Sequence, residues 1–214
     1  MLKYVVYLIY KNGDKKMDYL HITKGSGKMK GLDSLNTDNT IIDFCKKMYH
    51  SKNKNIICVD CYAWRMLLTF RKNCIPKFRA NTKKLKDLIR WDDLPRLFST
   101  ILRINSFGEI QNENHFLNVV NIAKKNPQTK IVVYTKRATI IKKVLSKINR
   151  PANMILIYSN PIKDKIMNTI PKFFDKVFNC VTEQRDDINC NKKCLDCMAC
   201  YNFNDTNIII ERVK

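Results

Sequence analysis

Seven of the nine cysteines stand in two short groups, and their spacing constrains the chain more than any other feature. Near the C-terminus, Cys190, Cys194, Cys197 and Cys200 follow one another as C-x3-C-x2-C-x2-C. Four thiols so close in sequence cannot all pair as disulfides without strain. Short loops of this kind instead wrap a metal ion or an iron–sulfur cluster. The C-terminal segment is therefore predicted to be organised by metal.

The upstream group reads C-x12-C-x2-C and consists of Cys45, Cys58 and Cys61, with Tyr62 directly after it. Three thiolates can leave one iron of a [4Fe-4S] cluster without a protein ligand, which is where a radical enzyme binds S-adenosylmethionine. A closed structural cluster is the first alternative, with a fourth ligand from Cys74, Cys180, a histidine or the other group. In a second alternative, Cys58 and Cys61 join two C-terminal cysteines around one zinc ion.

The choice between iron–sulfur and zinc depends on spacing and on histidine. Consecutive C-x2-C steps resemble ferredoxin-type ligation, whereas zinc sites usually combine separated C-x2-C pairs or add histidine. The chain has three histidines, His21, His50 and His115, and none is near the C-terminal group. Two [4Fe-4S] clusters are therefore expected, with zinc as the alternative. Cys74 and Cys180 are expected to be packed thiols, although Cys180 could replace Cys190 as a ligand.

Charge is the second constraint. Forty Lys and Arg against nineteen Asp and Glu give a net charge of +21. A folded body of this charge attracts phosphate backbones whatever their sequence. We therefore expect non-specific binding of nucleic acid, DNA or RNA, and compaction of long molecules where several basic faces bridge them. The lysines expected to contribute are those in local runs: Lys46, Lys47, Lys52, Lys54, Lys83, Lys84, Lys86, Lys142 and Lys143.

Short β-branched runs alternate with helical patterns, which predicts an α/β fold. The expected strands are Tyr4–Tyr10, Ile56–Val59, Ile101–Asn105, Ile131–Thr135, Met154–Ser159, Val177–Val181 and Ile208–Val213. The expected helices are Tyr62–Arg71, Lys83–Leu88, Leu94–Thr100, Glu113–Lys125, Ala138–Asn149 and Lys163–Asn168. Helical crossovers between apolar strands imply parallel pairing.

Ligands of parallel sheets bind at the carboxyl ends of the strands. The residues expected there are Asn105 to Glu109, Thr135 to Arg137, Ser159 to Asn160, and Thr182 to Glu183. Residues 1–184 are expected to form an α/β domain with the first cysteine group. Residues 185–214 are expected to be a cysteine-rich loop and terminal strand packed on the same domain.

The order of these motifs resembles a phage family called gene product eighty-eight. The resemblance rests on Gly27 to Gly31 (Gly-Lys-Met-Lys-Gly), on Cys58 to Ala63 after Cys45, and on Lys193 to Tyr201. Two strand ends add to it, Tyr134-Thr135-Lys136 and the turn Ser106-Phe107-Gly108-Glu109. The turn departs from the family's Ser-Gly-Asp pattern. The first C-terminal cysteine of the family corresponds here to Cys190 or Cys180.

That family is similar to shortened radical-SAM barrels, so the resemblance implies a partial, open barrel of mostly parallel strands. It also implies a viral protein made in the host cytoplasm, in a viral factory or in the virion. The chain has no apparent secretion signal or membrane span, which agrees with a reducing compartment. The leading hypothesis is a nucleic-acid-binding iron–sulfur protein. A radical-SAM-like enzyme is the alternative, and a zinc-organised structural protein is the third.

Overall fold

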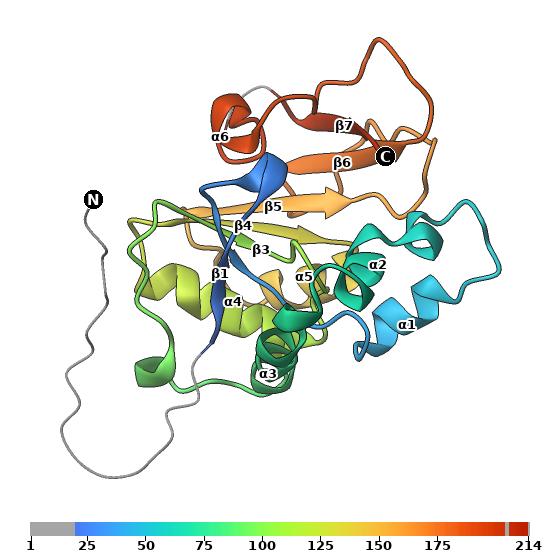
Figure 1. Cartoon of the computed structure of the whole chain (residues 1–214). Helices are drawn as coiled ribbons and strands as arrows, with labels where there is room; N and C mark the ends of the chain where they lie inside the picture. The colour runs from blue at the N-terminus through green and yellow to red at the C-terminus, as the bar shows by residue number, and fades with distance from the viewer. Residues whose placement is uncertain (1–19, 204–205, 214) are drawn as a thin grey trace, which may run out of the picture.

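The strands of the sheet follow one another in space in the order of the sequence (Figure 1). The computed structural model describes residues 20–203 and 206–213. Within them the strands are β1 (Ile22–Lys24), β2 (Asp33–Leu35), β3 (Ile101–Ile104), β4 (Lys130–Thr135), β5 (Met154–Ser159), β6 (Lys176–Val181) and β7 (Ile208–Arg212). β1 pairs antiparallel with β2, and each later neighbouring pair is parallel. β1 and β7 form the two edges, so the sheet is open rather than closed into a barrel.

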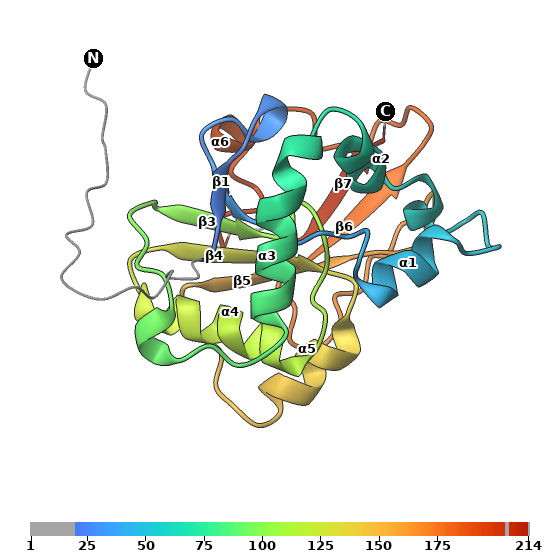
Figure 2. The same cartoon turned by 60° about the horizontal axis from the view of Figure 1, so that its bottom comes forward.

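The helices lie on both faces and at one edge of the sheet. They are α1 (Asp43–Tyr49), α2 (Tyr62–Leu68), α3 (Ile75–Leu85), α4 (Glu113–Lys125), α5 (Ala138–Leu145) and α6 (Cys194–Cys197). Short 3-10 turns are η1 (Gly27–Met29), η2 (Ile57–Asp60), η3 (Lys72–Cys74) and η4 (Trp91–Asp93). α3, α4 and α5 cover one face (Figure 2), while α1 and α2 lie beyond the carboxyl ends of β4 and β5 (Figure 1).

Both faces of the central strands are buried, as the alternation along β4 shows. Ile131 and Val133 pack into the cluster formed with α4 and α5. Val132 and Tyr134 point to the opposite face and pack against Tyr201 of the C-terminal segment. Successive side chains of a strand point to opposite faces, so an apolar run such as this one requires a cover on each side. Helices supply one cover and the cysteine-rich segment supplies the other.

The α/β fold with a mostly parallel sheet is confirmed, and so are the elements with the strongest periodicity. The expected helix Glu113–Lys125 has these bounds in the structure. The strands expected from residue 101 onward appear as β3 to β7 with shifts of one residue at some ends. The C-terminal segment contains α6 as well as loop. The expected strand Tyr4–Tyr10 lies outside the described residues.

Three expectations were wrong. Ile56–Val59 is not a strand, because only Ile56 makes a bridge and η2 follows it. No helix occurs at 94–100, where the side chain of Asn126 binds the backbone of Pro95 and Leu97. No helix occurs at 163–168 either, where Asn160 and Asn179 bind the backbone. In both loops, buried asparagine side chains make hydrogen bonds with backbone N–H and C=O groups that would pair with each other in a helix.

The expected helix Lys83–Leu88 is in fact the end of α3, which begins at Ile75 and stops at Leu85. Two short strands, β1 and β2, were missed because three-residue strands carry little periodicity. None of the helices in the described part of the chain is long and apolar enough to span a bilayer.

Candidate metal centres and basic surface

The first cysteine group lies at the carboxyl edge of the sheet. α1 carries Cys45, η2 carries Cys58, and Cys61 is the N-cap residue of α2, where its sulfur accepts a hydrogen bond from Trp64 N at 3.4 Å. The three thiols are close enough to influence one another electrostatically. Burial raises the pKa of Cys45 and of Cys58. The structure thus brings together residues that are up to sixteen positions apart in the sequence.

A buried carboxylate and a lysine lie beside these thiols. Glu109, in the turn after β3, accepts hydrogen bonds from the backbone of Ile110 (2.8 Å) and Lys136 (2.9 Å) and from the Thr135 hydroxyl. Burial raises the pKa of Glu109 despite these bonds. The Lys136 amino group donates to Ser159 Oγ at 2.8 Å. Glu109, Thr135, Lys136 and Ser159 were all expected at strand ends, and they do meet there.

Lys136 is a half-buried cation beside the first cysteine group. Burial acts to lower the pKa of Lys136, but Cys58 and Glu109 nearby outweigh burial, so the pKa is raised. Asn39, from the loop after β2, points its Nδ2 at Cys61 Sγ over 3.8 Å. Asn39 was not found from the sequence, because the strand that precedes it is short. An Asn-rich run before the first cysteine was the available signal.

Cys180 is close to residues in or beside each cysteine group. It lies on β6 within electrostatic reach of Cys58 and Lys136, and burial raises its pKa to about 11. Its position fits the alternative in which Cys180 is a fourth ligand of the first group. Cys180 also pairs in register with Glu211, which binds the Lys28 that contacts Cys190, so its role as a substitute for Cys190 stays a prediction. Cys74 is half-buried at the end of η3.

The second cysteine group covers the face of the sheet opposite α3, α4 and α5. α6 carries Cys194 and Cys197, and Met198 ends the helix with a left-handed backbone (φ 56°). Cys200 is buried in the cluster formed with β4 and β5. Cys200 is close enough to Cys190, Cys194 and Cys197 for their charges to influence one another's pKa. All four cysteines of the C-terminal motif therefore gather in one region.

Two cations lie against this group. Lys28 donates to Cys190 Sγ at 3.0 Å and forms an ion pair with Glu211 at 2.6 Å. Arg103, on β3, lies 3.9 Å above the Tyr134 ring, and its Nη1 is 3.4 Å from the Tyr201 hydroxyl. Its Nε is buried without a hydrogen-bond partner. Within the described residues, no carboxylate pairs with Arg103.

The thiols are gathered but do not converge on one point. No three Cys, His, Asp or Glu side chains in the part of the chain that the structure describes are placed to hold a single metal ion. Three or four thiols with few histidines are a donor set that both iron–sulfur clusters and four-cysteine zinc sites use.

Comparison with known proteins identifies the family. The model of the family described as gene product 88 matches residues 43–207, about three quarters of the chain. The chain belongs to this family. Neither the curated proteins nor the solved structures include a significant match. The match covers all seven grouped cysteines and Cys180, whereas the motif at residues 27–31 lies before it.

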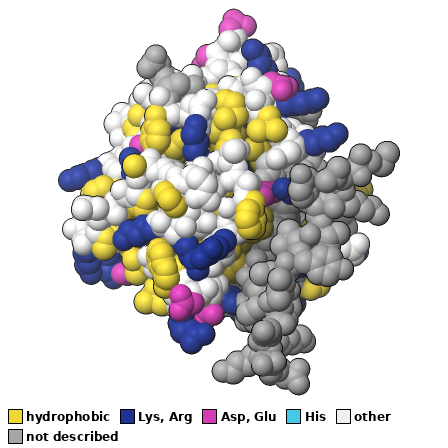
Figure 3. Space-filling model, turned by 90° about the vertical axis from the view of Figure 1, so that its left-hand side faces the viewer, with side chains coloured by type: hydrophobic (Ala, Val, Ile, Leu, Met, Phe, Trp, Pro, Cys, Tyr) yellow, Lys and Arg dark blue, Asp and Glu magenta, His cyan; other side chains and the backbone are white. Residues whose placement is uncertain are grey.

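Most of the lysines expected to contact nucleic acid in this gene product 88 protein are exposed. Lys84 is half-buried, Lys46 lies 3.9 Å from Asp43, and Lys143 pairs with Glu113 at 2.5 Å. On the side of the molecule in Figure 3, Lys and Arg side chains are scattered among hydrophobic and uncharged ones. The positive charge there is spread rather than gathered into one track.

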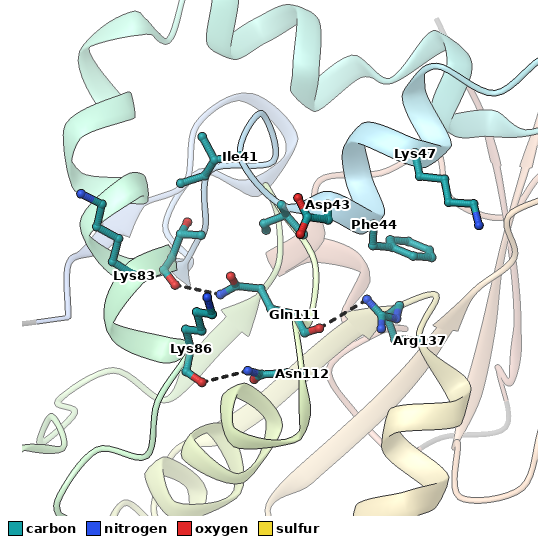
Figure 4. Close-up of a pocket in the computed structure, with 11 residues that line it drawn as sticks. Ile41, Asp43, Phe44, Lys47, Lys83, Lys86, Gln111, Asn112 and Arg137 are labelled. Carbon is teal, nitrogen blue, oxygen red and sulfur yellow. Dashed lines mark hydrogen bonds between the residues drawn. The ribbon is translucent and has the colours of Figure 1, made fainter.

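One cavity gathers three of these lysines. It has a volume of about 570 Å³ and lies between α1, the end of α3, the loop before α4 and the start of α5. Its lining residues are Ile41, Ile42, Asp43, Phe44, Lys47, Thr82, Lys83, Lys86, Gln111, Asn112 and Arg137 (Figure 4). Arg137 was expected at a strand end, but its place beside the lysines was not.

Proposed function

We propose that this protein holds two [4Fe-4S] clusters and binds nucleic acid through its basic surface. The observation that carries the first part is that one thiol group gathers at the carboxyl edge of the sheet and the other on the face opposite α3, α4 and α5. Cys45, Cys58 and Cys61 would hold one cluster. Cys190, Cys194, Cys197 and Cys200 would hold the other. The clusters would supply rigid cross-links whose shape depends on their redox state.

The unpaired Arg103 supports an anionic group at the second site. A buried guanidinium without a carboxylate is costly unless another negative charge compensates it. Thiolates bound to a cluster are such a charge, and Cys200 lies close to Arg103. Lys28 would play the same role at Cys190.

Anaerobic purification with iron, sulfide and zinc analysis tests the proposal. We expect a brown protein whose broad visible absorbance bleaches on reduction. Cys197→Ser or Cys200→Ser should halve the iron content, whereas Cys74→Ser, a substitution outside both groups, should leave it unchanged. A colourless protein with stoichiometric zinc would overturn the proposal in favour of a zinc-organised structural protein.

Nucleic-acid binding rests on the net charge of +21. Lys46, Lys47, Lys52, Lys54, Lys83, Lys84, Lys86, Lys142 and Lys143 would neutralise phosphates without reading bases. A filter-binding titration of unrelated DNA and RNA sequences at rising salt tests this. We expect similar affinities for all sequences, and a log affinity that falls by about 0.9 per phosphate contacted on duplex DNA. Absence of binding at low salt would contradict it.

A radical-SAM-like enzyme is the second candidate, and the position of the first group favours it. Three thiols lie at the carboxyl edge of parallel strands, beside Glu109 and Lys136, where ligands of such sheets bind. The open sheet would then be a partial radical-SAM-like barrel. Cys180 argues for a closed cluster instead. If the enzyme hypothesis holds, S-adenosylmethionine should perturb the EPR signal of the reduced protein, and 5′-deoxyadenosine should form. We expect neither.

The family points to a viral setting. Gene product 88 is a phage family, and we propose that the protein acts in the reducing cytoplasm of the host, where clustered thiols stay available for metal.

A further inference from the structure

The cavity between α1 and α3 is lined by more cations than acids. Four of its lining residues are cations, namely Lys47, Lys83, Lys86 and Arg137, and Asp43 is the one acid among them. The Asp43 side chain is fully exposed and lies 3.9 Å from Lys46. Lys86 and Arg137 lie on either side of Gln111, while the side chains of Lys47 and Lys83 point away from the middle of the cavity (Figure 4). The cations come from three separate segments, so the tertiary structure creates this concentration of charge.

These cations have almost no partners. Within the described residues, the amino groups of Lys47, Lys83 and Lys86 make no hydrogen bond or ion pair. Arg137 lies 4.7 Å above the Phe44 ring and makes two long contacts of 3.4 Å with backbone oxygens. Other exposed lysines such as Lys52 and Lys72 also lack a carboxylate partner within the described residues, but the four cations named here share one cavity. Like charges held together without counter-ions in a concave site attract an anion.

The geometry points to a binding site for the phosphate of a nucleotide, and we propose that this cavity holds one phosphorylated nucleotide, at the end of a single strand or free. This deepens the nucleic-acid binding proposed above and rests on it for the strand. A volume of about 570 Å³ is in the range of small-ligand pockets. A duplex cannot enter a site of this size, but one nucleotide can.

The rest of the lining suits the sugar and base. Phe44 and Ile41 supply apolar surface, while Gln111 and Asn112 supply amide groups (Figure 4). The Gln111 and Asn112 amide nitrogens already donate to backbone oxygens of Thr82 and Lys86. Those bonds hold the cavity wall in place before a ligand arrives. A preformed wall reduces the ordering that binding would otherwise require.

The test compares two variants that lose the same charge. The cavity variant carries Lys47→Gln, Lys83→Gln and Lys86→Gln. The control carries Lys72→Gln, Lys77→Gln and Lys147→Gln, all exposed and outside the lining. Fluorescence anisotropy would follow short 3′-labelled thymidine strands with and without a 5′-phosphate, and thymidine monophosphate would be the competitor. Thermal melting would confirm that both variants fold.

We expect the cavity variant to bind the 5′-phosphorylated strand at least about tenfold more weakly than the wild type does. The control variant should bind it at most about threefold more weakly than the wild type. The monophosphate should displace the phosphorylated strand from the wild type. If both variants lost the same affinity for the strand and the monophosphate did not compete, the proposed nucleotide site would be wrong. Non-specific binding of nucleic acid would be unaffected by that result. If the wild type bound the monophosphate but no strand, the cavity would stand and the proposed nucleic-acid binding would fail.

Discussion

Gly108, in the turn that brings Glu109 to the carboxyl edge, is constrained in two ways. Its backbone has φ +88°, and an added Cβ would overlap the Thr37 side chain. Gly108→Ala should therefore lower the free energy of unfolding by about 3 kcal/mol. Gly27→Ala is the matched control, because Gly27 also has positive φ but nothing surrounds its Cβ position. Gly27→Ala should lower the free energy of unfolding by about 1 kcal/mol. Urea denaturation measures both, and equal losses would show that the Thr37 contact does not matter.

His115 predicts a dependence of stability on pH. Burial lowers its pKa from 6.5 to about 3. Its Nδ1 accepts a hydrogen bond from Gln111 N, and its Nε2 is buried without a partner. The unfolded chain binds a proton below pH 6.5 and the folded chain only near pH 3. Stability is therefore complete above pH 6.5 and declines as pH falls toward 3, by about 2 kcal/mol at pH 5.

The variant His115→Asn isolates this effect. Its amide oxygen can still accept from Gln111, but it does not titrate. Urea denaturation of both proteins at several pH values should show the wild type losing more stability between pH 6.5 and 5. Parallel curves over that interval would assign the acid sensitivity to other groups.

At the scale of elements, the C-terminal segment is held to the sheet by Tyr201. Its side chain is 1% exposed, packs in the cluster with β4 and β5, and contacts Arg103. Tyr201→Ala should destabilise the protein by about 3–5 kcal/mol and make the segment more sensitive to proteolysis. Phe203→Ala is the control, since Phe203 is 60% exposed in the same segment. It should change stability by at most about 0.5 kcal/mol. Similar proteolysis of the two variants would show that Tyr201 is not the anchor.

At the scale of the whole molecule, the proposed clusters would join short segments to one another and to the sheet. The first group ties α1, η2 and α2 together, and the second ties residues 190–200 to the sheet. Removing iron by chelation should therefore lower the melting temperature by at least about 5 °C, because metal binding contributes folding free energy. Reconstitution with iron and sulfide should restore it. Identical melting of loaded and iron-free protein would mean that the clusters do not support the fold.

The sequence alone determined the elements whose signal is local. The 3.6-residue period predicted α4 with its bounds, and β-branched runs predicted β3 to β7. Helical patterns between those runs predicted a parallel sheet, and cysteine spacing predicted two groups of thiols. Such patterns are read within a window of about a dozen residues, which is also the range over which they act.

The tertiary structure decided everything that depends on contacts between distant segments. It placed Cys180 close to Cys58, and it brought Lys86 and Arg137 to one cavity. It also turned the expected helices at 94–100 and 163–168 into loops, because asparagines far along the chain bind their backbone. Local propensity is worth a few tenths of a kcal/mol per residue. Burial and side-chain hydrogen bonds are worth more, and the sequence does not reveal which distant residues will make them.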